Sequence, residues 1–124
     1  MSLKRFISAQ QHSYEVALKE IKQGRKQSHW MWYIFPQEAG LGHSEMAKRY
    51  AIKDADEAAA YLAHPVLGNR LIEISHAVLM INHKSANEIF GSPDDVKLRS
   101  CMTLFASAPN ADPVFDKVLE KYFG

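Results

Sequence analysis

The segment His29–Gln37, HWMWYIFPQ, holds both tryptophans of the chain between a histidine and a proline. Rings such as Trp30 and Trp32 either pack in a core, which is the simpler reading, or form the wall of a binding site that stacks a base or a sugar ring. The segment is too short to predict its secondary structure, and a buried strand is one alternative. In a strand both rings lie on one side, whereas in a helix they lie about 200° apart, so that one faces a core and the other a cleft.

A loop with two glycines follows this segment, and Gly40, Gly42 and Ser44 are its candidate binding residues. Backbone N–H groups in such a loop can hold an anion. The alternative is a tight turn in which the glycines only supply a positive φ. The residues that are candidates for the countercharge are Lys26, Lys97 and Arg99.

Other arrangements that resemble catalytic or metal sites have simpler explanations. Glu73 and His76 lie three apart on a predicted helix, but without a second such pair they indicate an exposed ion pair rather than a metal site. Cys101 lies in a predicted helix without an adjacent histidine, which is typical of a small buried side chain. Asp94 and Asp95 follow Ser-Pro at a predicted helix start, where acidic groups complement the helix dipole. No metal and no cofactor is predicted.

The elements that must position these side chains are predicted to be helices. The first spans about residues 4–23, either continuous or broken near Ser8, which with Gln11 has capping-box spacing, or near Ser13. Apolar residues in steps of four and three predict the central helix of the fold. They are Leu67, Leu71, Ile74, Val78 and Ile81. Because no hairpin signal appears, we predict an all-α protein of about six or seven helices with short loops, forming one domain over residues 1–124.

Composition narrows the classes of function. The 124 residues carry a formal net charge of +1, which gives no electrostatic case for a nucleic-acid-binding protein. The only cysteine permits no internal disulfide, as is typical of a reducing compartment. No apolar run reaches the roughly 20 residues needed to span a bilayer, and the N-terminus does not resemble a signal peptide. A cytoplasmic protein without a membrane partner is expected.

Three stretches of the chain resemble the signature of an uncharacterised family of small bacterial proteins, some of which carry a mistaken calpastatin label. They are GRKQSHWMWYIFPQ with GLGHS, AAAYLAHPVLGNRL, and IFGSPDDVKLRSCMTLF. The resemblance implies a compact, all-helical domain with no established activity. Members tend to continue beyond the equivalent of Gly124, so that anything such a tail supplies is expected to be missing here. The polar residues that belong to the family motifs are Lys26, Ser28, His29, Gln37, Ser44, His64, Arg70, Asp94, Lys97, Ser100 and Thr103.

Two functions remain open, and whether the protein is an enzyme is open as well. The first is a pocket for a small anionic or nucleotide-like ligand, in which His29 orients the ligand or acts as an acid or base without a metal. The second is a helical module that binds a partner protein or a second copy of itself, with Met31, Trp32 and Tyr33 exposed as a contact patch. The residues predicted to bind the ligand are Lys26, Trp32, Gln37, Gly40, Gly42, Ser44, Lys97 and Ser100.

Overall fold

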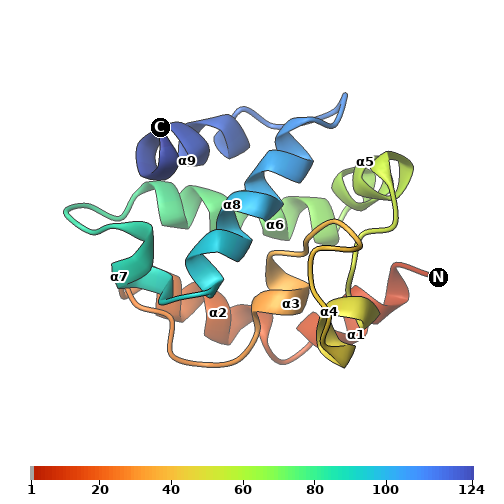
Figure 1. The fold of residues 1–124 in the computed structure, drawn as a ribbon, viewed down its shortest axis with the longest axis horizontal. Coiled ribbons are helices and arrows are strands. Elements are labelled where there is room, and N and C mark those ends of the chain that lie inside the picture. Colours follow the sequence, from red (N-terminus) through yellow and green to blue (C-terminus); the bar gives the residue numbers. More distant parts are fainter. Residues whose placement is uncertain (1) are drawn as a thin grey trace.

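The computed structural model describes residues 2–124, and these residues form nine helices and no β-strand. The prediction of an all-α fold is therefore confirmed, and the layers of helices can be followed in Figure 1. The helices are α1 (Lys4–Gln10), α2 (Tyr14–Lys22), α3 (Met31–Ile34), α4 (Glu45–Arg49), α5 (Ala55–Ala63), α6 (Leu67–Leu79), α7 (Ala86–Phe90), α8 (Asp94–Ala106) and α9 (Val114–Phe123).

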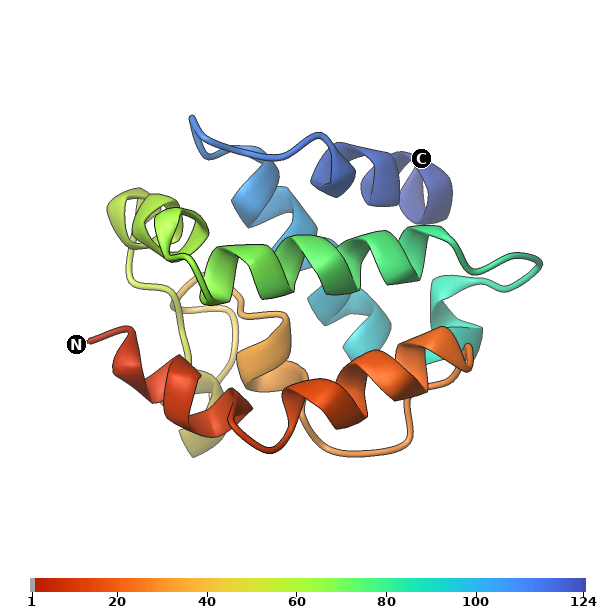
Figure 2. The same ribbon diagram turned by 180° about the vertical axis from the view of Figure 1, so that it is seen from behind.

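Helix α6 is the centre of the fold, as its apolar stripe predicts. It packs against α2, α5 and α9, and Figure 2 shows it crossing the molecule between α2 and α9. The stripe is confirmed from Leu67 to Val78, all of whose members are buried, but Ile81 lies beyond the end of the helix. The helix starts at Leu67, and the Nδ1 atom of His64 accepts hydrogen bonds from the amides of Val66 and Leu67 at this end.

The predicted first helix is broken between Gln10 and Tyr14. Of the predicted alternatives, the break near Ser13 is therefore the one that is confirmed. The break has a packing reason, since α1 packs against α3 whereas α2 packs against α6. The predicted capping box at Ser8 is wrong, because Ser8 lies inside α1 and caps nothing. The end of α2 is as predicted. Gly24 has a φ of +84°, and the amide of the next residue closes the helix on the carbonyl of Glu20.

The aromatic segment forms the single-turn helix α3, so the strand alternative is wrong. Trp30 is only 1% exposed, whereas Trp32 is half-buried, as expected when a helical turn directs the two rings to different sides. This turn and the break after α1 explain why the described residues form nine helices rather than six or seven.

The buried apolar side chains form one cluster to which most of the helices contribute. Cys101 is part of it, and burial raises the pKa of its thiol, which makes the thiol a poor nucleophile. Among residues 2–124, every helix is too short or too polar to cross a lipid bilayer.

Candidate functional site

Helix α3 is held at its start by Glu20, a buried carboxylate at the end of α2. Its Oε1 atom accepts hydrogen bonds from the amides of Gln27 and Ser28, at 2.8 and 2.9 Å, and from the indole N–H of Trp30 at 2.9 Å. Its Oε2 atom accepts a hydrogen bond of 2.6 Å from the Ser28 hydroxyl. Burial alone would raise the pKa of Glu20, but these four hydrogen bonds lower it to about 2.

The other end of α3 is held by Gln10, which is 1% exposed. Its side-chain amide donates to the carbonyl of Tyr33 at 2.8 Å and to the hydroxyl of Tyr61 at 3.0 Å. Its oxygen accepts a longer bond, 3.3 Å, from the guanidinium of Arg70. Because both ends of α3 are tied to buried polar groups, the direction of the Trp32 ring is set by the core rather than by solvent.

A carboxylate on the first turn of α8 joins the aromatic segment to that helix. Asp94 lies 2.9 Å from the ammonium of Lys26 and 3.6 Å from the ammonium of Lys97. Lys26 also donates to the carbonyl of Ser28 at 2.6 Å. The ammonium of Lys97 lies 5.3 Å from the centre of the Trp32 ring, within the range of a cation–π interaction. Two ammonium groups thus share one carboxylate, which leaves this cluster with a net positive charge.

The segment that faces α8 is shaped by its backbone. An isolated parallel bridge joins Glu38 to Ile52, and Ile52 donates its amide to the carbonyl of Gln37 at 2.8 Å. Gly40 has a φ of +94°, a conformation that favours glycine. A Cβ atom on Gly42 would lie 2.5 Å from the Cβ of Ala47, so only glycine fits there without movement. Both glycines therefore have structural reasons to be present.

Between this segment and α8 lies a pocket of about 320 Å³, which we call the Lys97 pocket. Four of the residues predicted to bind a ligand, Gln37, Gly42, Ser44 and Lys97, line it together. No carboxylate belongs to its lining, so the ammonium of Lys97 is its dominant charge. The full lining is Gln37, Leu41, Gly42, His43, Ser44, Ala47, Pro93, Val96 and Lys97.

A second hollow, of about 540 Å³, continues along the exposed face of α8, and we call it the α8 groove. It shares Leu41 and Val96 with the Lys97 pocket, so the two hollows adjoin. Ser100, another predicted binding residue, lies here rather than in the pocket. The groove is lined by Glu38, Leu41, Val96, Arg99, Ser100, Thr103, Leu104 and Ser107.

The structure does not bring all the predicted residues together. Trp32 contacts Lys97 but does not line the pocket, and Lys26 is linked to Lys97 only through Asp94. Gly40 and His29 are exposed and line neither hollow. The exposed patch expected at the aromatic segment is corrected as well, because Met31 is 2% exposed and belongs to the core.

Sequence reasoning missed the residues that act at a distance along the chain. No local pattern indicates that Glu20 and Gln10 hold α3, since each is one of several polar residues on its helix. The sequence predicts that Asp94 complements the helix dipole, and its position on the first turn of α8 agrees with that, but its carboxylate also pairs with two lysines. Glu73 accepts a hydrogen bond from the hydroxyl of Tyr14. No three potential metal-ligating side chains come together within residues 2–124.

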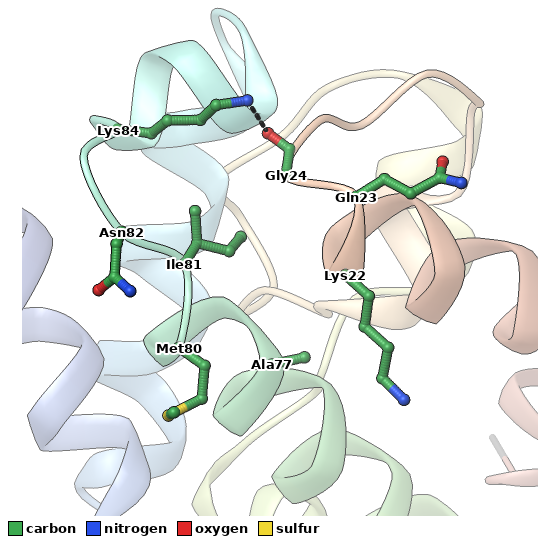
Figure 3. A pocket seen from close by; sticks show the side chains of 8 residues that line it. All are labelled: Lys22, Gln23, Gly24, Ala77, Met80, Ile81, Asn82 and Lys84. Carbon is green, nitrogen blue, oxygen red and sulfur yellow. Dashed lines mark hydrogen bonds between the residues drawn. The ribbon is translucent and has the colours of Figure 1, made fainter.

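A third hollow, of about 470 Å³, lies where α2 and α6 end, and none of the predicted site residues lines it. Figure 3 shows Lys84 reaching across this hollow, and its ammonium donates a 2.9 Å hydrogen bond to the carbonyl of Gly24. Met80, which is 72% exposed, and Ala77 form its apolar side.

Comparison with known proteins agrees with the resemblance seen in the sequence motifs. The chain belongs to the family described as "Protein of unknown function (DUF1810)", which it matches over residues 1–124. Its structure is similar to that of the conserved hypothetical protein Rv1873 from Mycobacterium tuberculosis, with a TM-score of 0.96 and 50% sequence identity. That match covers 98% of this chain and 87% of the other. No curated protein matches, and the function of the family is unknown.

Proposed function

We propose that this protein binds a small organic anion in the Lys97 pocket. The observation that carries the proposal is the position of the Lys97 ammonium, which lies in the lining of a pocket without a carboxylate and beside the face of the Trp32 ring. A cation placed on an aromatic ring in a partly enclosed site is suited to an anionic ligand that carries a flat or apolar part.

Lys97 is the lysine of the cluster that is free to change partner. Its ammonium is 3.6 Å from Asp94, whereas that of Lys26 is 2.9 Å away and has the Ser28 carbonyl as a second partner. When Lys97 turns toward a ligand, Lys26 continues to compensate the charge of Asp94. The cost of releasing Lys97 is therefore small, because no buried carboxylate is left unpaired.

Two neutral side chains of the pocket supply further donors. The Ser44 oxygen accepts a 3.1 Å hydrogen bond from the amide of Ala47, which leaves the hydroxyl proton of Ser44 available to a ligand. The side-chain amide of Gln37 lines the pocket, and no hydrogen bond to another residue of the range 2–124 occupies it. Together with Lys97 they present N–H and O–H groups, which is what the oxygens of a phosphate or carboxylate require.

Acid or base chemistry by His29 remains a separate prediction, because the exposed imidazole is outside the pocket lining. The proposal is a binding function, located in the cytoplasm. The cytoplasmic location rests on the single buried thiol of Cys101, which suits a reducing compartment.

The test is a titration of the full chain with inorganic phosphate, followed by the NMR signals of the amides around the Lys97 pocket. Lys97→Gln is expected to weaken phosphate binding by at least about tenfold, because a hydrogen bond to a charged group contributes roughly 1.5–3 kcal/mol. The unfolding free energy should change little, since Lys97 is a partly exposed member of a loose ion pair.

Lys117→Gln is the matched control, because Lys117 is exposed on α9 and lines none of the hollows described above. It should bind phosphate like the parent protein. Equal losses in the two variants would show that only net charge matters, and the proposal would be wrong.

A further inference from the structure

We infer that the natural ligand of this site is a phosphorylated sugar or polyol, with its phosphate in the Lys97 pocket and its hydroxyl groups in the α8 groove. The inference rests on the proposed function and extends it to a class of ligand. The two hollows adjoin through Leu41 and Val96, so that one molecule can occupy both.

The hydroxyl groups that line the groove can only accept hydrogen bonds from a ligand. A backbone carbonyl has no proton to give, so a hydroxyl bonded to a carbonyl must be the donor. The proton of each groove hydroxyl is therefore used within α8 or at its end, and the oxygen lone pairs remain. The three hydrogen bonds run from Ser100 to the Val96 carbonyl (3.2 Å), from Thr103 to the Arg99 carbonyl (2.8 Å) and from Ser107 to the Leu104 carbonyl (2.7 Å).

The charged residues of the groove extend this pattern. The carboxylate of Glu38 is a further acceptor, and neither it nor the guanidinium of Arg99 forms an ion pair with another residue in the described range 2–124. Arg99 is the one strong donor in the lining, which leaves acceptors in the majority. Leu41, Val96 and Leu104 supply apolar surface between the polar groups.

Hydrogen-bond donors therefore prevail at the end of the continuous hollow formed by the Lys97 pocket, and hydrogen-bond acceptors prevail along the α8 groove. The Lys97 pocket offers the ammonium of Lys97, the hydroxyl proton of Ser44 and the amide of Gln37. A phosphate group, whose oxygens accept, fits that end. Sugar hydroxyls, which can donate, fit the groove, and the C–H faces of a sugar ring can lie on the apolar side chains. Free phosphate satisfies only one end of the site, and a free sugar only the other.

The experiment compares inorganic phosphate, ribose 5-phosphate, glucose 6-phosphate and free ribose in NMR titrations of the full chain. At least one of the two sugar phosphates is expected to bind about tenfold more tightly than inorganic phosphate, as two additional hydrogen bonds would produce. The signals of the Ser100 and Thr103 amides should shift with that sugar phosphate only. Free ribose should shift none of them.

Variants of groove residues test whether the additional affinity for the sugar phosphate comes from the α8 groove. The double variant Ser100→Ala/Thr103→Val is expected to lose the gain from the sugar while it binds inorganic phosphate as before. Glu38→Gln, which exchanges an acceptor-only side chain for one that also donates, should reduce the gain in part. Ser8→Ala is the control, because Ser8 is an exposed helical serine on α1, away from the groove.

The outcomes separate the two proposals. If phosphate binds in a Lys97-dependent way and neither sugar phosphate binds more tightly, the inference about the ligand class is wrong and the proposed function stands. If the gain persists in both the double variant and Glu38→Gln, the placement of the sugar in the α8 groove is wrong, and the proposed function again stands. If neither phosphate nor the sugar phosphates shift the signals of the Lys97 pocket, the proposed function itself fails.

Discussion

The Lys97 pocket and the hollow at the ends of α2 and α6 both contain lysines at their rims, yet their lysines have different partners. Lys84 donates to the carbonyl of Gly24, and beside that hollow Lys121 donates to the carbonyls of Leu79 and Ile81. These ammonium groups satisfy carbonyls that the ends of the helices leave free. Lys97 has a loose ion pair with a carboxylate that Lys26 already compensates, and its other neighbour is the face of the Trp32 ring.

Neither the size of a hollow nor the charge of its rim separates the two regions, so we base the roles that we propose for them on the partners of each charged group. A lysine that completes a helix terminus cannot turn toward a ligand without exposing a carbonyl group, whereas Lys97 can. We therefore expect changes in the two regions to affect different properties, stability in one and binding in the other.

The largest expected effect tests how the pocket depends on the core. Glu20→Ala removes the acceptor of the Trp30 indole, of two amides and of the Ser28 hydroxyl. Leaving such buried donors unpaired should lower the free energy of unfolding by about 3 kcal/mol and, by releasing α3, weaken phosphate binding as well. Urea denaturation and the phosphate titration measure the two effects. A stable variant with unaltered binding would show that α3 is positioned by its apolar contacts alone.

A smaller, pH-dependent effect follows from the same carboxylate. The pKa of Glu20 is lowered from an ordinary 4.5 to about 2 in the folded protein, so its contribution to stability is fully present above pH 4.5 and is lost as the pH falls toward 2. The difference in unfolding free energy between the parent protein and Glu20→Ala should accordingly be largest at pH 7 and narrow below pH 4.5. Other acidic groups are common to both proteins and cancel. A difference that stays constant from pH 7 to pH 3 would contradict the assignment.

The smallest expected effect lies in the other region. Lys84→Met keeps the aliphatic stem but removes the donor to the Gly24 carbonyl, and should lower the unfolding free energy by about 0.5–1 kcal/mol. Phosphate binding should not change, which is the opposite of the result expected for Lys97→Gln. A loss of phosphate binding in Lys84→Met, observed together with normal binding in Lys97→Gln, would reverse the roles that we assign to the two hollows.

The parts of the fold that local signals determine could be predicted from the sequence. The stripe on α6 and the glycine at the end of α2 need only the spacing of neighbouring residues. The same holds for the caps of α4, α5 and α7, where Ser44, Asp54 and Ser85 are of the residue types that favour a helix N-cap. The break after α1 could be offered only as an alternative, because it depends on which partners the two halves find.

The candidate site could be predicted only in part, for the same reason. Gln37, Ser44 and Lys97 are polar residues of the family motifs, and the pocket contains all three. The roles of Glu20 and Asp94 depend on contacts between segments distant in the chain, which no local pattern encodes. The sequence predicts His29 at the pocket because it begins the aromatic segment, but its side chain is exposed outside the pocket lining.

The different surroundings of the two tryptophans give the protein two intrinsic fluorescent probes. Trp30 is buried and bonded to a carboxylate, so its fluorescence should report whether the chain is folded. Trp32 is half-buried under the ammonium of Lys97, so its emission should respond to whatever draws that charge away. The variant Trp32→Phe would keep Trp30 as its single tryptophan, which reports folding. The variant Trp30→Phe would keep Trp32, which reports occupancy of the pocket. Neither variant needs an added dye or label.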